Sequence, residues 1–162
     1  MEIVRLDVEL APKVLALMEL GEPYIRARTP SDYWLYARLF SSTCPVALVD
    51  NSLAGAVIAF RSQDHPDEVY IQDVMTHPEH RRTGVTRALI GDVRARAAEW
   101  GCSRVYLTSE PENVAGHVTW TALGFTNVPG DYVVSDVVSV IADYKGPGKD
   151  RSVYELDPRT GG

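Results

Sequence analysis

The stretch EVYIQDVMTHPEHRRTGVTRALI, residues 68–90, constrains the fold of this chain more than any other segment. Residues 68–76 favour a β-strand, and apolar residues then recur at helical spacing from about residue 84 to 100. The segment therefore predicts a strand, a short loop and a helix. Arg81 and Arg82 stand just before the helix, although the dipole of a helix start favours negative rather than positive side chains.

An anion held by this loop would explain the two arginines. Free N–H groups at a helix start point outward, and arginine donates charge-assisted hydrogen bonds to phosphate oxygens. Gly84 lets the backbone approach a ligand closely. The spacing R-x-x-G-x-T matches neither the P-loop nor the dinucleotide-binding fingerprint. The alternative interpretation is an amphipathic helix with a solvated, basic start.

The bulk properties of the chain predict an ordinary cytoplasmic domain. A length of 162 residues suits one domain spanning residues 1–162. No apolar run approaches the roughly 20 residues of a membrane span, and the start MEIVRLDVEL lacks the regions of a signal peptide. Cys44 and Cys102 are the two cysteines, and neither sits in a paired motif, which is typical of a reduced compartment.

The charge is unevenly distributed along the chain. A formal net charge of −6 argues against a general nucleic-acid binder, which normally carries a basic surface. Residues 81–104 nevertheless contain six arginines against one aspartate and one glutamate. A solvated helix surface and a small polyanionic ligand explain this basic segment equally well. We expect no nucleic-acid partner and no membrane partner.

The order of the expected elements indicates an α/β (α+β) fold with helices covering a mixed sheet. Ser31 is the expected cap of the second helix, and an Asn-Ser turn is expected to join the second and third strands as a hairpin. The expected elements are strand 2–6, helices 11–20 and 32–40, strands 45–50, 51–60 and 68–76, helix 84–100, strand 103–109, helix 113–123, a β-branched run over 132–141 and strand 152–156.

Two motifs carry a resemblance to a known family. The loop reads RRTGVT over residues 81–86 after VMTHPEH, and ENVAGHVTWTALGF covers residues 112–125. They resemble, in order and spacing, the acetyl-CoA motif R/Q-x-x-G-x-G/A and the later Asn-led helix of the GNAT superfamily of N-acyltransferases. Thr86 is the one departure from the loop motif. The resemblance implies helices on both faces of a mixed central sheet, in which two parallel strands splay apart to form a cleft for CoA.

The resemblance also implies how acetyl-CoA is bound. The backbone of Val74, Met75 and Thr76 should pair with the pantetheine arm, whose amides satisfy the open edge of a split sheet. We expect the side chains of Val74 and Met75 to lie in the core. Asn113 and Trp120 should face the cofactor from the other side. The residues assigned to the pyrophosphate loop are Arg81, Arg82, Thr83, Gly84, Val85 and Thr86.

Acetylation of an amine needs a neutral amine, a stabilised oxyanion and a protonated leaving thiolate. Asp73 is the candidate base, because a carboxylate in the apolar run YIQDVM should have a raised pKa. It acts on the amine directly or through water; the alternative is a purely structural carboxylate. Glu110, at the end of the next strand, is the second candidate.

The acid is harder to assign, since Trp120 stands where the family usually has a tyrosine. An indole N–H donates a hydrogen bond but is no useful acid. His117 shares a helix face with Asn113 and Trp120 and is the candidate acid, the alternative being a surface histidine. Tyr132, Tyr144 and a thiolate that leaves without a dedicated acid remain open. We expect no metal site, because the other histidines lack partners at metal-ligand spacing.

The acceptor pocket is expected between the early helices and the segment before the last strand. Tyr33 and Tyr36, with Trp34 between them in sequence, offer apolar and cation–π surface, and Gln72 lies on the strand beside Asp73. FSSTCPVALVD over residues 40–50, together with YIQDV over residues 70–74, is similar to diaminobutyrate acetyltransferases. The tryptophan that this family has in the strand is Gln72 here. The candidate anionic partners for an amine are Asp131, Asp136 and Asp143.

The sequence thus predicts an N-acetyltransferase that moves an acetyl group from acetyl-CoA directly to a primary amine of a small molecule, through a tetrahedral intermediate. An amino acid, a diamine or another amine-bearing metabolite would serve as acceptor. A CoA-binding sensor without turnover and an enzyme acting on a peptide or protein amine are the alternatives. Because dimers are common in the family, a homodimer is one assembly that the resemblance allows.

Overall fold

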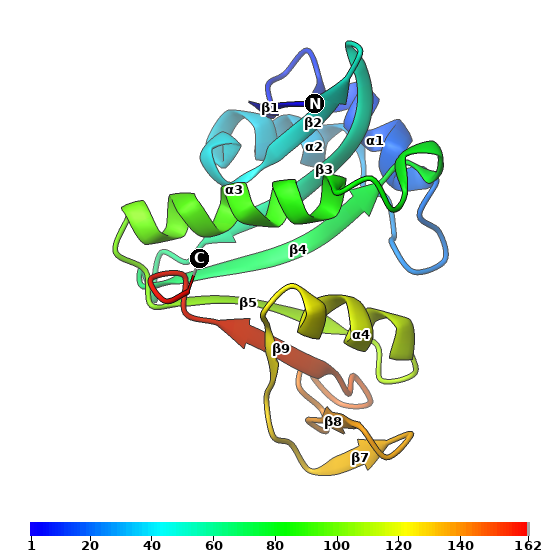
Figure 1. Ribbon diagram of the computed structural model, residues 1–162, viewed down its shortest axis with the longest axis vertical. Coiled ribbons are helices and arrows are strands. Elements are labelled where there is room, and N and C mark those ends of the chain that lie inside the picture. The colour runs from blue at the N-terminus through cyan, green and yellow to red at the C-terminus, as the bar shows by residue number, and fades with distance from the viewer. Residues whose placement is uncertain (162) are drawn as a thin grey trace.

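The computed structural model describes residues 1–161 as a mixed sheet flanked by helices (Figure 1). The helices are α1 (Ala11–Glu19), α2 (Pro30–Leu39), α3 (Val85–Glu99) and α4 (Val114–Ala122), with short 3₁₀ turns at Ser41–Thr43 and Pro78–His80. The strands are β1 (Glu2–Arg5), β2 (Pro45–Val49), β3 (Ser52–Arg61), β4 (Glu68–Thr76), β5 (Arg104–Ser109), β6 (Thr126–Asn127), β7 (Tyr132–Val134), β8 (Val138–Val140) and β9 (Ser152–Leu156).

The main sheet has seven strands in the order β1-β2-β3-β4-β5-β9-β6. Its neighbouring strands are antiparallel except β4 and β5, which run parallel. A parallel pair needs a crossover connection, and α3 supplies it. β7 and β8 form a separate hairpin. The predicted mixed sheet with helices is therefore confirmed, and it contains one parallel seam at its centre.

The two parallel strands pair over only part of their length. Residues Glu68–Ile71 of β4 are in register with Arg104–Leu107 of β5, and the pairing stops there. Residues 72–76 continue to pair with β3 on the other side. β4 and β5 consequently diverge toward their C-terminal ends (Figure 1). This divergence leaves one edge of residues 72–76 without a strand partner in the described part of the chain.

A β-bulge at Gln72 sets the direction of the side chains at this point. Ile58 of β3 pairs with Asp73, whereas the next residue, Ala59, pairs with Ile71, so Gln72 is the extra residue. Without a bulge, Gln72 and Asp73 would point to opposite faces of the sheet. Instead both turn toward the side of α2, where Gln72 bonds Tyr36 and Asp73 approaches Arg28.

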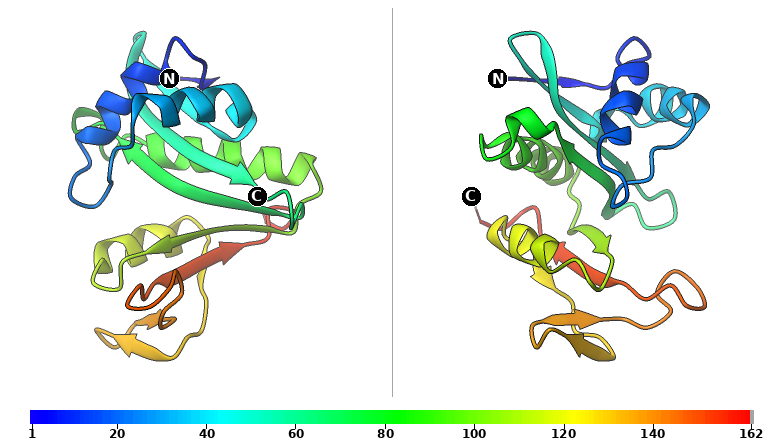
Figure 2. Two further views of the ribbon diagram at one scale, coloured as in Figure 1. Left: turned by 180° about the vertical axis from the view of Figure 1, so that it is seen from behind. Right: turned by 90° about the vertical axis from the view of Figure 1, so that its right-hand side faces the viewer.

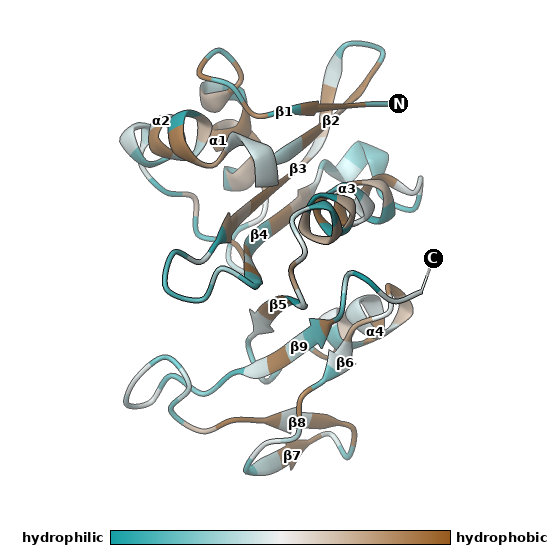
Figure 3. Cartoon of the chain, turned by 90° about the vertical axis from the view of Figure 1, so that its left-hand side faces the viewer, coloured by the Kyte–Doolittle hydropathy of each residue, from teal (hydrophilic) through white to brown (hydrophobic). Residues whose placement is uncertain are grey.

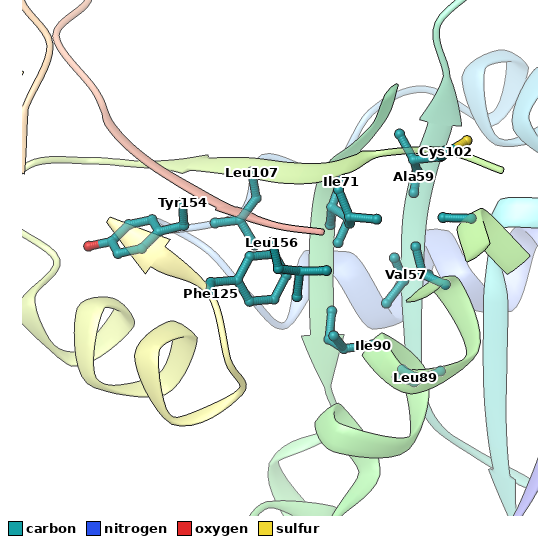
Figure 4. Close-up of a cluster of buried hydrophobic side chains, with 14 of the residues drawn as sticks. Val57, Ala59, Ile71, Leu89, Ile90, Cys102, Leu107, Phe125, Tyr154 and Leu156 are labelled. Carbon is teal, nitrogen blue, oxygen red and sulfur yellow. The ribbon is translucent and has the colours of Figure 1, made fainter. Parts of the chain in front are cut away.

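Hydrophobic side chains cover both faces of strands β1–β4, which form the upper half of the sheet in Figure 1. α1 and α2 cover one face and share a core with Val46, Ala56 and Ile58, while α3 covers the other. The two further views and the hydropathy-coloured cartoon show the apolar strands β2–β4 between these helices (Figures 2 and 3). The core under α3 continues past the seam to Leu107, Phe125 and Leu156 (Figure 4), which joins β5 and β9 to the upper half. Helices on both faces are confirmed.

Several element boundaries differ from the expectation. Thr29, and not Ser31, caps α2: its hydroxyl accepts from the Asp32 N–H while Asp32 accepts from the Thr29 N–H, a capping box. Pro30 then takes the first helical position, which its ring favours. The run over 132–141 forms a hairpin of two short strands, and β6 was not expected. Within residues 1–161 no helix is long and apolar enough to cross a bilayer.

Candidate active site

The basic loop turns the backbone sharply before α3. Arg82 has φ 62° and Gly84 has φ 86°, both in the left-handed region, and Gly84 is the N-cap of α3. Alternating backbone conformations of this kind line up N–H groups in a concave anion-binding nest. A Cβ added at Gly84 would meet no atom of the protein within 4 Å, so packing does not demand glycine there. The space above Gly84 is open.

That open space belongs to a pocket of about 410 Å³ between the loop and α4. Arg81 and Arg82 are exposed at its rim, and Arg87 adds a third cation. The first turn of α3 contributes its free N–H groups on the same side. The pocket is lined by Thr76, His80, Arg81, Arg82, Gly84, Val85, Thr86, Arg87, Val118, Thr119, Ala122 and Leu123. This combination suits a polyanion with an apolar body.

Two threonine hydroxyls hold the loop in place. The hydroxyls of Thr86 and Thr76 are 2.8 Å apart, which ties the first turn of α3 to the last residue of β4. The Thr83 hydroxyl donates to the carbonyl of His80. Thr86 is the position at which the loop departs from the usual motif, and here its hydroxyl is used in a structural contact. The loop is therefore positioned before any ligand arrives.

Beside the loop, the end of β4 offers backbone rather than side chains to the cleft. Val74 packs against the core under α3 and Met75 lies in the core under α1 and α2. Met75 is buried as expected, whereas Val74 is only partly buried against its core. Because β5 has already turned away, the N–H and C=O groups of residues 72–76 that point away from β3 have no strand partner. They are free to pair with an extended, amide-bearing ligand.

Asp73 lies near Arg28, on the face of the sheet that α1 and α2 cover, whereas the loop leads into α3 on the other face. Its side chain is 11% exposed, and one carboxylate oxygen is 3.4 Å from Nη1 of Arg28. Burial raises the pKa of Asp73 above its ordinary value, as the sequence predicts, while the charges of Arg28 and Lys145 pull it back. A carboxylate with a raised pKa is a better proton acceptor than an ordinary surface carboxylate.

The aromatic residues of α2 differ in how they reach this site. Tyr36 is 8% exposed, and its hydroxyl accepts a hydrogen bond of 3.2 Å from Nε2 of Gln72. Tyr33 is 1% exposed and packs edge-on against Tyr36 inside the core. Its hydroxyl accepts from the backbone N–H of Arg28. Tyr33 therefore supports the wall from behind rather than forming its surface, and this corrects the expectation for that residue.

The loop from residue 142 to 150 also differs from the expectation. Asp143 accepts from the Gly148 N–H and Asp131 from the Ala142 N–H, so both carboxylates hold the loop together. The side chain that turns toward the sheet is a cation: Nζ of Lys145 donates to the Tyr70 hydroxyl at 2.8 Å. Sequence reasoning missed Lys145 and Arg28, because nothing local in the sequence links either to β4.

Comparison of the sequence with known proteins identifies the family of this chain. The sequence profile of the acetyltransferase (GNAT) family matches residues 14–125, which is more than half of the chain. The chain belongs to the acetyltransferase (GNAT) family. The match includes the pocket loop, the splayed strands and α4.

Individual relatives add detail. The L-2,4-diaminobutyric acid acetyltransferase of Nocardia farcinica is 33% identical over 91 residues, which are 56% of this chain. The matched stretch spans about half of that relative's own length, 47%. Diaminobutyrate acetyltransferase from Paenibacillus lautus, solved with its diamino acid and coenzyme A, superposes with a TM-score of 0.75 at 20% identity, covering 99% of this chain and 98% of that one. The ribosomal-protein-S18-alanine N-acetyltransferase of Escherichia coli superposes with a TM-score of 0.71 at 16% sequence identity, and the match covers 99% of this chain and 96% of that one.

In this GNAT chain, the face of α4 that carries the later motif turns away from the pocket. Asn113 is the N-cap, and its side-chain oxygen accepts from the Gly116 N–H. His117 places Nδ1 3.0 Å from the Tyr154 hydroxyl on β9. Trp120 packs on Phe125 at the edge of the core. Instead, Val118, Thr119 and Ala122 line the pocket. The structure does not bring His117 and Trp120 together with Asp73.

The remaining proton-transfer candidates have other partners. Glu110 is 59% exposed and its carboxylate lies 3.6 Å from Arg151. The Tyr132 hydroxyl donates to Asp150, and this hydrogen bond raises the pKa of Tyr132 to about 12. Both residues thus contact the segment that leads into β9, whereas Asp73 lies on β4 near Arg28. Among residues 1–161 no group of three His, Cys, Asp or Glu side chains is placed to hold a metal ion.

Proposed function

We propose that this GNAT chain transfers an acetyl group from acetyl-CoA to a primary amine of a small molecule. The observation that carries the proposal is that the C-terminal end of β4 lies between the anion-binding loop and Asp73. The anion-binding loop and its pocket lie on one side of residues 72–76, and Asp73 with Tyr36 and Gln72 lies on the other. A donor and an acceptor bound on these two sides would meet at the splay.

The residues of the pocket fit acetyl-CoA. The left-handed turns at Arg82 and Gly84 and the three arginines suit its pyrophosphate. The open edge of residues 72–76 suits the amides of its pantetheine arm. The Paenibacillus lautus structure was solved with coenzyme A, which supports this assignment for a chain of the same fold. Acetyl-CoA supplies the acyl group as a thioester, and no metal is needed.

The residues of this chain would act mainly on the amine. An acceptor arrives largely as an ammonium ion and must lose a proton before its nitrogen can attack. Asp73 takes that proton, directly or through one water, because its carboxylate is buried at the acceptor side and its pKa is raised. The neutral nitrogen attacks the thioester carbonyl and forms the C–N bond of a tetrahedral intermediate, and collapse of this intermediate breaks the C–S bond and releases the thiolate. Because His117 is bonded to Tyr154 and away from the cleft, we propose that water returns the proton to the sulfur.

A small-molecule acceptor is favoured over a protein. The curated relative that matches this chain over 91 residues is named for a diamino acid. Buried Tyr36 and half-buried Gln72 close the acceptor side toward α2, which suits a compact ligand. The alternative is a CoA-binding module without turnover, and the orientation of His117 and Trp120 away from the cleft favours it.

Calorimetric titration with acetyl-CoA tests the donor site. Wild type should bind saturably, and the Arg82→Ala, Gly84→Asp double variant should lose roughly tenfold or more in affinity, since it removes a charge-assisted contact and places a carboxylate at the anion site. Arg38→Ala, at an exposed position of α2, is the matched control and should bind as wild type.

Release of CoA in the presence of a panel of amines tests turnover. Amine-dependent release by wild type, lost in Asp73→Asn, supports the enzyme. Tight acetyl-CoA binding without release for any amine or peptide supports the binding module instead. Absence of acetyl-CoA binding by the folded wild type would refute both functions.

A further inference from the structure

Two cations converge on the acceptor side of Asp73 from opposite walls. Arg28 comes from the segment between α1 and α2, and Lys145 comes from the loop before β9. Both charges act on Asp73 and lower its pKa against the effect of burial. Neither residue belongs to the loop that we assign to acetyl-CoA. Their presence beside a carboxylate that must handle an ammonium ion calls for a separate explanation.

Arg28 is fixed in place but keeps free donors. Its backbone N–H donates to the Tyr33 hydroxyl, and it directly precedes Thr29, the N-cap of α2. Nη1 donates to the carbonyl of Arg26 at 2.8 Å and approaches Asp73 at 3.4 Å. Within residues 1–161 its Nε and Nη2 have no hydrogen-bond partner, and the side chain is 37% exposed. The guanidinium therefore has a fork of donors to offer to a ligand.

The nearby Asp32 does not use up this capacity. Its carboxylate accepts from the Thr29 N–H at 2.9 Å and from the Thr29 hydroxyl at 2.8 Å. It therefore serves the start of α2.

Lys145 is held by uncharged groups. Nζ donates to the Tyr70 hydroxyl at 2.8 Å and lies 5.3 Å from the centre of the Tyr70 ring. In the described part of the chain no carboxylate lies within ion-pair distance of it. The loop that carries it is closed at its base by the paired backbones of Ile141 and Arg151. An exposed ammonium on a closed loop beside the site is available to an anionic ligand.

We propose that the acceptor carries a carboxylate as well as its amine, and that Arg28 and Lys145 bind this carboxylate while Asp73 handles the amine. The inference rests on the proposed function, because it concerns the same acceptor site. Arginine and lysine side chains that both act on the same site recognise an anion, and arginine matches carboxylate geometry in particular. The substrate class is thus a small amino acid or diamino acid.

The spacing of the contacts limits the size of the ligand. Tyr70, which contacts Lys145, and Asp73, which contacts Arg28, pair with Phe60 and Ile58 of β3, two positions apart because of the bulge, so they lie roughly 7 Å apart along the sheet. A molecule with its amine and carboxylate a few bonds apart fits between them. A phosphate dianion fits less well than a carboxylate, because Asp73 lies 3.4 Å from Arg28 and repels two negative charges more strongly than one.

Paired ligands that differ by the carboxylate alone test this inference. In the presence of CoA, binding of 2,4-diaminobutyric acid, ornithine and lysine is measured by calorimetry against the corresponding diamines, each lacking only the carboxylate. Wild type should bind at least one amino acid roughly tenfold or more tightly than its diamine, as expected for charge-assisted hydrogen bonds. Arg28→Gln and Lys145→Met should each remove most of that difference by weakening binding of the amino acid, without weakening binding of the diamine.

Matched controls lie close to both cations. Arg26→Gln changes an exposed arginine two residues from Arg28, and Lys149→Met changes an exposed lysine of the same loop as Lys145. Both control variants should keep the preference for the amino acid. A general loss of charge near the cleft would instead weaken binding in all four variants.

The outcomes separate this inference from the proposed function. Equal binding of amino acid and diamine by wild type, or equal losses for both ligands in Arg28→Gln and Lys145→Met, would overturn the carboxylate site while acetylation of diamines still supports the enzyme. A preference for the amino acid without CoA release would support the binding site and overturn turnover. Absence of binding for every pair would overturn both.

Discussion

Asp73 is held between opposing influences. Burial favours its protonated form, while Arg28 and Lys145 favour the carboxylate. Tyr33 and Tyr36 pack on the same side, and burial raises the pKa of both hydroxyls, which stay neutral near pH 7. A carboxylate of this kind is costly to bury in its charged form. A buried carboxylate with a raised pKa is typical of functional sites, and two measurable consequences follow for Asp73.

The first concerns activity as a function of pH. If Asp73 is the base, kcat/KM should rise as the carboxylate ionises, with an acidic limb above the ordinary aspartate value of 3.8, because burial raises its pKa. Asp73→Asn should lose that limb and about 10²- to 10⁴-fold in rate. The pH profile of CoA release, with the exposed Asp64→Asn as control, checks this. An unchanged acidic limb in Asp73→Asn would assign the base elsewhere.

The second concerns stability. A folded-state pKa above the unfolded value means that the native state binds the proton more tightly. The contribution of Asp73 to stability is then full below pH 3.8 and is lost as pH rises through its folded pKa. Asp73→Asn lacks this titration, so its melting temperature should gain on wild type between pH 3.5 and about pH 7. Parallel melting curves for the two proteins over that range, with no relative gain, would contradict the raised pKa.

At the scale of elements, the position of α3 decides the geometry of the loop. Gly55 on β3 lets α3 approach closely: a Cβ there would lie 2.7 Å from Val85 and 2.9 Å from the Met75 carbonyl. Val85 is the first residue of α3 and directly follows Gly84. The packing of a helix on the sheet is thus coupled to the anion-binding turn, and it can be perturbed without touching that turn.

Gly55→Ala should push the start of α3 outward. We expect a loss of about 1–3 kcal/mol in unfolding free energy, as for overpacked cores, together with weaker acetyl-CoA binding. Gly91→Ala is the control, because Gly91 lies within α3 with open space around it; it should gain roughly 0.5–1 kcal/mol and bind normally. Denaturant unfolding and calorimetry measure both. Normal acetyl-CoA affinity in Gly55→Ala would show that loop and helix packing are independent.

The elements that sequence could predict are those with local signals. The helix expected over 113–123 forms as α4 directly after Asn113, and the basic loop lies between β4 and α3 where the motif places it. The cap at Thr29 also has a local signal, because Asp32 follows three residues later, but the expected cap at Ser31 does not take it into account. The bulge at Gln72 is different, because strict alternation sends Gln72 and Asp73 to opposite faces and only pairing with β3 reveals the extra residue. Lys145 reaches Tyr70 across 75 positions of sequence, which no local pattern encodes.

At the scale of the whole molecule, a short parallel seam joins two halves of the sheet. Four register pairs link β4 to β5, and the shared core around Phe125 and Leu156 reinforces them. Beyond the seam, residues 72–76 have an open edge. The cleft therefore lies where the sheet is least interconnected, and a ligand that pairs with this edge would add the missing strand contacts.

Amide hydrogen exchange should show whether the open edge of residues 72–76 pairs with the ligand. Amides of residues 72–76 that point away from β3 should exchange fast in the free protein, whereas those of 68–71 are protected by both neighbours. Saturating acetyl-CoA should slow exchange in 72–76 by about tenfold or more, because its amides pair with them. Protection of the loop at 82–86 without protection of 72–76 would mean that only the phosphates are bound.

The closed loop over residues 142–150 has a consequence for how such a protein evolves. It is sealed at its base by Ile141 and Arg151, and its aspartates bond its own backbone. The side chain of Lys145 connects this loop to the sheet through its hydrogen bond to the Tyr70 hydroxyl. Changes within it can therefore alter which acceptor is selected while the strands and the acetyl-CoA cleft stay intact. If Lys145 binds the acceptor as proposed, a single substitution in this loop should change acceptor preference and leave acetyl-CoA binding unaltered.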